Sequence, residues 1–173
     1  DPRHNISQRE NVDISRIVIC HGATQGLHIA ICAALAKNEN KTVTIAVESP
    51  CYAPIVQSPQ LFNHEVIKVN RHQPEDNLGF WRIDKNQWFK AIKESSILMI
   101  TPILNPSGWD YHPDDRNWIV NTCKENGVII IADEVYLDSK KRKEDYVPFH
   151  KLGEHCISIN SLTKIYSLGT IRF

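Results

Sequence analysis

A lysine flanked by hydroxyl side chains stands near the end of the sequence, and its amine has the chemistry to form an imine. Ser161, Thr163 and Lys164 lie within four residues of one another, and Arg172 follows eight residues after the lysine. An arginine fork suits bidentate contact with a phosphate. The group is therefore a candidate site for imine formation beside a phosphate clamp. A lysine that is simply solvated is the plain alternative.

A carboxylate follows the strongest candidate for a buried strand, Val128–Ala132 (Val-Ile-Ile-Ile-Ala). Asp133 would stand at the end of that strand, where an unpaired carboxylate costs free energy. We therefore expect a cationic partner for it. A protonated pyridine nitrogen would serve, and an ion pair with a nearby lysine or arginine is the structural alternative.

Three further polar clusters follow apolar runs. Gly22, Ala23 and Thr24 precede a predicted helix, whose N-terminus would suit a phosphate, although Thr24 as a simple N-cap explains the same residues. Tyr52 is placed to stack on a planar ring or to pack as an ordinary tyrosine. Asn105 opens an Asn-Pro-Ser-Gly turn and is either a donor to a ligand oxygen or part of a plain loop.

Short apolar runs alternate with amphipathic stretches along the chain. The runs predict strands over residues 16–20, 42–47, 65–69, 97–101, 128–132 and 155–159. The amphipathic stretches predict helices over residues 24–37, 53–62, 88–94 and 113–126, the last of them stopped by Gly127.

This alternation predicts an α/β fold with a mostly parallel, or mixed, sheet sandwiched by helices. Ligands of such folds gather at the carboxyl ends of the strands, where all five polar clusters would lie. A dinucleotide-binding fold is the rival with the same architecture. It is disfavoured because no Gly-x-Gly-x-x-Gly follows the first predicted strand.

Composition excludes several classes of function. The 173 residues carry a formal net charge of zero, so no basic surface for nucleic acid is expected. No apolar run approaches the ~20 residues that cross a bilayer, and the polar N-terminus has no signal pattern, so we expect a cytoplasmic protein away from membranes. The five cysteines, without CxxC spacing, are expected to be buried and reduced, and no histidine motif predicts a metal site.

The succession Gly-Ala-Thr, Pro-Cys-Tyr, Asn-Pro-Ser-Gly, Asp-Glu-Val-Tyr and Ser-Leu-Thr-Lys with Arg172 resembles the fold-type I enzymes that use pyridoxal 5'-phosphate (PLP). Within them it is similar to the aminotransferase class I/II family, from about Arg16 to Phe173. The resemblance implies that residues 1–173 are the PLP-binding large domain. The resemblance implies, in addition, that the N-terminal segment and the C-terminal small domain of that family are absent from this sequence.

The resemblance also implies a role for each motif residue. Lys164 would form a Schiff base with PLP and later move the substrate's proton. Asp133 would keep the pyridine nitrogen protonated, Asn105 and Tyr136 would hydrogen-bond the phenolic oxygen, and Tyr52 would stack on the ring. The phosphate would be held by Gly22, Ala23, Thr24, Ser161 and Arg172.

The chain departs from the family pattern in three places. Relatives usually carry glycine where this chain has Ser167 and Thr170, and many carry serine where it has Ala23. Contact with the phosphate at position 23 would then come from the backbone N–H alone.

The function implied by the resemblance is transamination between an amino acid and a 2-oxo acid, in a homodimer. Elimination, decarboxylation or cyclisation of an amino acid on the same core is the first alternative. An inactive fragment that binds PLP, or a partner, without turnover is the second. Trp81, Trp88 and Trp109 are candidates for substrate specificity, with core packing as the plainer explanation for all three.

Overall fold

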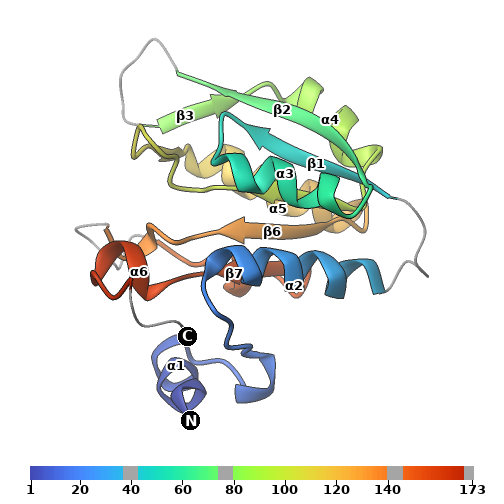
Figure 1. The fold of residues 1–173 in the computed structure, drawn as a ribbon. Helices are drawn as coiled ribbons and strands as arrows, with labels where there is room; N and C mark the ends of the chain where they lie inside the picture. The colour runs from blue at the N-terminus through green and yellow to red at the C-terminus, as the bar shows by residue number, and fades with distance from the viewer. Residues whose placement is uncertain (37–42, 74–79, 140–145, 170–173) are drawn as a thin grey trace.

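The computed structural model describes residues 1–36, 43–73, 80–139 and 146–169. These residues form a seven-stranded sheet with the order β5-β3-β2-β1-β4-β6-β7 (Figure 1). Neighbouring strands run parallel except for the antiparallel pair β2 and β3, as predicted for a mixed, mostly parallel sheet. The strands are β1 (Thr44–Ser49), β2 (Glu65–His72), β3 (Phe80–Ile83), β4 (Ile97–Ile100), β5 (Asp110–Tyr111), β6 (Ile129–Asp133) and β7 (Cys156–Ile159).

Helices cover both faces of the sheet, and each face has its own apolar core. On one face, α2 packs on β6 and β7, and α3 packs on β1 and β2. On the other, α4 packs on β2 and α5 packs on β6, around the fully buried Trp88. The helices are α1 (Pro2–Glu10), α2 (Ala23–Ala36), α3 (Ala53–Leu61), α4 (Lys85–Lys93), α5 (Pro113–Glu125) and α6 (Leu162–Ile165).

The predicted strand over residues 16–20 is wrong. Arg16 closes a 3-10 turn (Ile14–Arg16), and the backbone then runs on without strand pairing as far as α2. Ile17 has extended dihedral angles, as its β-branched side chain favours, yet Val18 is 67% exposed. A strand also needs a hydrogen-bonded neighbour, and no described segment pairs with this one.

Several elements escaped the sequence prediction. Strands β3 and β5 are too short for an apolar period and exist because they pair with β2 and with each other. Helix α4 begins three residues before its predicted start, because Asp84 caps it by accepting hydrogen bonds from Asn86 N (2.9 Å) and Gln87 N (3.3 Å). The stop at Gly127 is confirmed, since that glycine has a φ of 69°.

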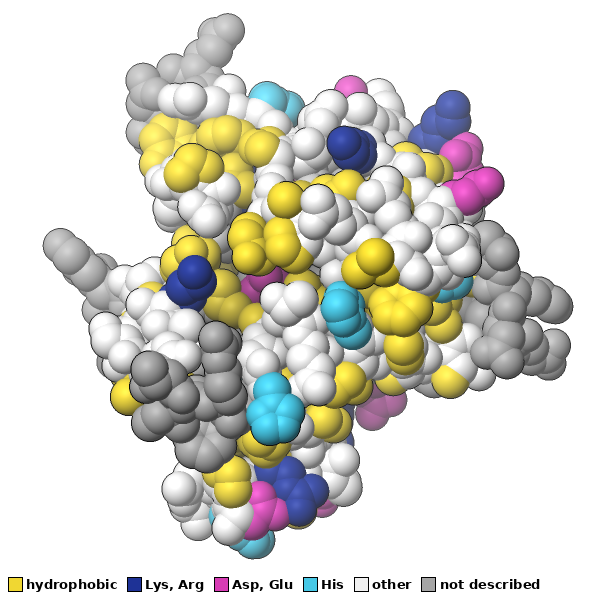
Figure 2. Space-filling view, in the orientation of Figure 1, with side chains coloured by type: hydrophobic (Ala, Val, Ile, Leu, Met, Phe, Trp, Pro, Cys, Tyr) yellow, Lys and Arg dark blue, Asp and Glu magenta, His cyan; other side chains and the backbone are white. Residues whose placement is uncertain are grey.

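Composition also led to expectations about membrane spans, metal sites and the cysteines. None of the helices in the described ranges combines the length and apolar character needed to span a bilayer. The same residues bring no three potential metal ligands together. All five cysteines are free, but only Cys123 and Cys156 are buried, since Cys20 and Cys51 are half-buried and Cys32 is exposed. Hydrophobic side chains reach the surface between polar ones on the face seen in Figure 2.

The strand order decides where the functional residues meet. β1, β4, β6 and β7 are consecutive neighbours and run parallel, with Val47 beside Met99, Ile100 beside Ala132, and Asp133 beside Ile159. Their carboxyl ends therefore form one edge of the sheet. The segments that leave this edge carry the predicted site residues, except for Gly22, Ala23 and Thr24, which lie at the start of α2.

Candidate functional site

Asp133 is the last residue of β6 and is almost completely buried, with 6% of its surface exposed. Burial raises the pKa of its carboxyl group to about 6, although a hydrogen bond from Val135 N and the positive charge of Lys164 act in the opposite direction. The Val135 N–H donates to Oδ1 over 3.3 Å. Among the described residues no lysine or arginine forms an ion pair with this carboxylate.

The neighbouring Glu134 has a different role, which the sequence did not suggest. Its side chain is buried and accepts hydrogen bonds from the Tyr146 hydroxyl (2.7 Å) and from Phe149 N (3.2 Å). Glu134 N donates to Ile159 O over 2.7 Å. These bonds tie the end of β6 to β7 and to the following chain, and so hold the backbone beside Asp133.

Lys164 lies on the short helix α6, directly after β7. Ser161 caps this helix, because its Oγ accepts a hydrogen bond from Thr163 N (3.1 Å) and lies 2.6 Å from the Thr163 hydroxyl. The Lys164 side chain is exposed, and its charge acts on Asp133. The structure therefore brings the predicted lysine and the predicted aspartate to the same edge of the sheet.

The glycine turn before α2 also lies near this edge of the sheet. Gly22 has a φ of 99°, which favours glycine, and α2 begins at Ala23. Thr24 is thus inside the first turn, and the simple explanation of Thr24 as the N-cap is wrong. Instead, the Gln25 side chain folds back and accepts a hydrogen bond from His21 N over 2.6 Å. The first-turn N–H groups of α2 have no partner within the helix.

Asn105 and Tyr52 follow β4 and β1. Asn105 is exposed in a loop closed by hydrogen bonds from Leu104 N to Trp109 O (3.0 Å) and from Gly108 N to the Leu104 carbonyl. Tyr52 directly precedes α3 and is 53% exposed. Both side chains therefore remain accessible at the carboxyl edge of the sheet.

Tyr136 and Arg172 complete the predicted set. Tyr136 is half-buried three residues beyond the end of β6, and its carbonyl accepts from Ser139 N and Ser139 Oγ. Arg172 lies outside the described residues. Of the three tryptophans, Trp88 is a core residue whose Nε1 donates to Asn70 O over 2.9 Å, which confirms the packing explanation for that one.

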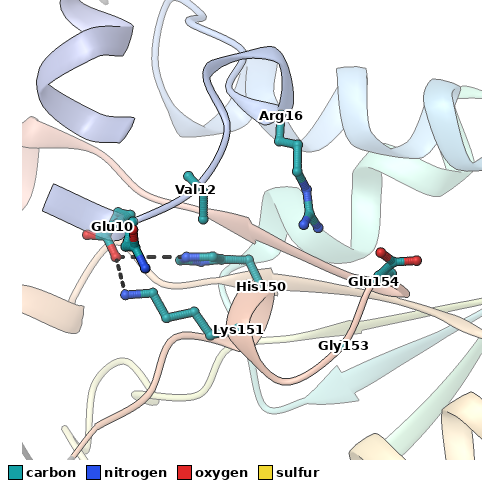
Figure 3. Close-up of a pocket in the computed structure, with 8 residues that line it drawn as sticks. Glu10, Val12, Arg16, His150, Lys151, Gly153 and Glu154 are labelled. Atoms are coloured by element: carbon teal, nitrogen blue, oxygen red, sulfur yellow. Dashed lines mark ion pairs between the residues drawn. The ribbon is translucent and has the colours of Figure 1, made fainter. Parts of the chain in front are cut away.

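A separate hollow lies beside α1, away from the predicted residues (Figure 3). Glu10 reaches across it to Lys151 Nζ (3.2 Å) and His150 Nε2 (3.8 Å), while Arg16 and Glu154 line its far side. None of the predicted site residues lines this hollow. We therefore centre the candidate site on Asp133 and Lys164 rather than here.

Residues 4–173 match the family model described as "Aminotransferase class I and II". The aspartate aminotransferase of Bacillus subtilis (strain 168) is 23% identical over 159 residues, which cover 89% of this chain and 38% of that protein. The chain thus spans well under half the length of this relative.

Two solved structures have the same fold. The Thermus thermophilus aspartate aminotransferase tetra mutant 1 superposes with a TM-score of 0.82 at 21% identity, covering 98% of this chain and 47% of that one. The PLP-bound C-S lyase from Staphylococcus hominis has a TM-score of 0.75 at 19% identity, covering 90% and 39%.

Proposed function

The chain belongs to the aminotransferase class I and II family, and from this premise we propose that it forms the PLP-binding large domain of an aminotransferase. The enzyme would exchange an amino group between an amino acid and a 2-oxo acid. The main observation in support is the environment of Asp133. This carboxylate is buried, its pKa is raised to about 6, and it has no ion-pair partner among the described residues. Such a group is costly unless a cation faces it.

The residues present fit PLP at both ends of that molecule. A ring N–H⁺ facing Asp133 would supply the missing cation in a charge-assisted hydrogen bond. The first turn of α2, opened by Gly22, offers free N–H groups for the phosphate, and Ala23 would contribute its backbone N–H. Lys164 would hold the cofactor through Nζ. We propose that Ser161 and Arg172 also contact the phosphate.

Bound PLP supplies an electron sink for bond breaking at the α-carbon of an amino acid. The chain's own residues then divide the work. Lys164 Nζ would take the proton from the α-carbon, and Asp133 would keep a proton on the ring nitrogen. Asn105 and Tyr136 would donate to the phenolic oxygen, and Tyr52 would cover one face of the ring. Ser161 holds the start of α6 and so sets where Lys164 emerges.

The proposal is tested by adding PLP to the purified protein and recording the visible absorption band, followed by borohydride reduction and peptide mapping. We expect a band that is lost in Lys164→Ala and an adduct on the peptide that contains Lys164. Lys93→Ala, in α4 on another part of the surface, is the matched control and should keep both signals. A band that survives Lys164→Ala would refute the assignment.

Elimination from a sulfur-containing amino acid is a second candidate, supported by the likeness to the C-S lyase at a TM-score of 0.75. Both reactions would use the same cofactor residues, so product analysis has to separate them. Release of ammonia together with an oxo acid indicates elimination. Transfer of the amino group to an added 2-oxo acid indicates transamination.

We also propose a homodimer that works in the cytoplasm. Apolar side chains exposed on α2 and at the end of α3, such as Ile29 (39%), Leu61 (72%) and Phe62 (38%), support an association surface. Sedimentation velocity on the enzyme with and without PLP tests this proposal, and a monomer in both states would contradict it.

A further inference from the structure

Arg71, at the carboxyl end of β2, is completely buried in a setting made of backbone carbonyls and one carboxylate. Its Nη1 lies 2.8 Å from Glu48 Oε1, and both side chains are 0% exposed. Glu48 in turn accepts a hydrogen bond from Thr101 N over 2.7 Å through its other oxygen. The pair therefore joins the ends of β1, β2 and β4.

The same guanidinium reaches both ends of the loop that carries Asn105. At the loop's entry, Nη1 donates to Thr101 O (3.0 Å), and both terminal nitrogens lie 3.3 Å from Pro102 O. At its exit, Nη2 donates to Trp109 O over 3.2 Å. One planar side chain thus joins the two segments of the loop that flank Asn105, its entry and its exit.

The chemistry of arginine explains why this residue type stands here. Buried carbonyls need donors, and the loop supplies few of its own. Guanidinium presents several N–H groups in a rigid plane, whereas the ammonium group of lysine is a single point. The Tyr111 ring lies 3.9 Å from Cζ and covers one face of the guanidinium. Nε is buried without a hydrogen-bond partner among the described residues, so the two terminal nitrogens make the bonds that allow the side chain to act as a template for the loop.

Stability alone does not account for the pair. A buried ion pair is often no more stabilising than well-packed apolar side chains of similar size, because both charges lose their hydration. What the pair does supply is a defined geometry for the loop. That geometry matters at this position, since the loop leaves the sheet edge at which Asp133 and Lys164 meet.

We propose that Arg71, charge-paired with Glu48, is a positioning residue that holds the Asn105 loop closed and thereby sets the place of the Asn105 side chain. The part that concerns Asn105 rests on the proposed function, in which this side chain donates to the phenolic oxygen of PLP. The part that concerns the loop is independent of any cofactor.

The loop is tested first, in the protein without PLP, by hydrogen exchange of its backbone amides. Glu48→Leu/Arg71→Met removes both charges and avoids leaving one of them buried alone. We expect a cooperative fold in which the amides of Leu104 and Gly108 exchange about tenfold faster or more. Unchanged exchange in the folded double variant would overturn the proposal.

A conservative variant gives a second test of the loop. Arg71→Lys keeps the positive charge but cannot reach the entry and exit carbonyls together, so it should also accelerate exchange of the loop. Arg82→Lys is the matched control, because Arg82 lies on the neighbouring strand β3 and its guanidinium pairs with the buried Asp115 over 2.8 Å rather than with the loop. It should leave the loop unaffected. Equal protection of the loop in Arg71→Lys and wild type would refute a role for the planar fork.

The cofactor arm measures the pH at which the absorption band of bound PLP titrates. Loss of a donor to a phenolate disfavours the deprotonated form, so Asn105→Ala should move the midpoint to higher pH. The Glu48→Leu/Arg71→Met variant should move it the same way, and adding Asn105→Ala to it should give no further shift. If the midpoint shifts in Asn105→Ala but not in Glu48→Leu/Arg71→Met, the positioning role is overturned. Failure of every variant and of wild type to bind PLP would refute the proposed function, while the exchange data still decide the role of Arg71 in the loop.

Discussion

Gly26 in α2 and Ile159 at the end of β7 lie so close together that a Cβ at position 26 would stand 3.2 Å from Ile159 Cγ2. It would also stand 3.3 Å from Cys20 Sγ. This contact seats the first turn of α2 directly against the strand that leads to Ser161 and Lys164. A side chain at this position would therefore require Ile159 or Cys20 to shift by a few tenths of an ångström.

Gly26→Val should disturb both the first turn of α2 and the end of β7. Two added methyl groups beyond the Cβ have no space, so we expect the free energy of unfolding to fall by about 1–3 kcal/mol. The affinity for PLP should fall as well, because α2 must move away from β7. Urea denaturation and PLP titration measure the two effects. Gly169→Ala is the matched control, since its Cβ would meet Thr163 Cγ2 at an ordinary 3.6 Å. Wild-type stability and affinity in Gly26→Val would show that the contact is slack.

Asp133→Asn should stabilise the protein without cofactor and weaken its binding of PLP. The folded pKa of about 6 exceeds the ordinary value of 3.8, so the folded state binds the extra proton between these values. Stability contributed by this group is therefore present at low pH and is lost as the pH rises through that window. An amide avoids the loss, and we expect a gain of roughly 1–3 kcal/mol at pH 8 that vanishes below pH 4.

Urea denaturation at the two pH values measures the stability, and PLP titration measures the affinity. In wild type the affinity should fall as the pH drops below about 6, where Asp133 takes up its proton. Asp133→Asn should lack this dependence and bind PLP about tenfold or more weakly. A variant that is less stable than wild type at pH 8 would mean that a protein cation already compensates the carboxylate.

Ser167 has a φ of 54°, in the left-handed region that glycine favours. Ser167→Val should lower the free energy of unfolding by about 1–2 kcal/mol, because a β-branched side chain is strained there. Ser167→Gly should change it by less than about 1 kcal/mol, since relief of strain is offset by the freer unfolded chain. Thermal denaturation measures both. Asn63→Gly is the control at a φ of 57°, where asparagine is already tolerated. Equal stability of Ser167→Val and Ser167→Gly would contradict the strain.

Much of the architecture was predictable because buried parallel strands have a clear sequence pattern. Ile97–Ile100 and residues 129–132 are continuous apolar runs, as expected of strands covered on both faces. The helix stop at Gly127 was equally plain. Residues 16–20 looked no less like a strand, yet they form none, because a strand exists only beside a partner and periodicity carries no information about partners.

The same distinction between sequence and tertiary structure applies to the candidate site. The sequence by itself determined which chemistry is available: an amine, a carboxylate, a glycine turn and an asparagine, each placed just after an apolar run. Adjacent parallel strands then bring the amine, the carboxylate and the asparagine to one edge, which follows from topology. Only the tertiary structure decided that Asp133 has a raised pKa, that Gly26 lies against Ile159, and that Arg71 pairs with Glu48. Burial and contact depend on what surrounds a residue in space, and these neighbours lie far apart along the chain.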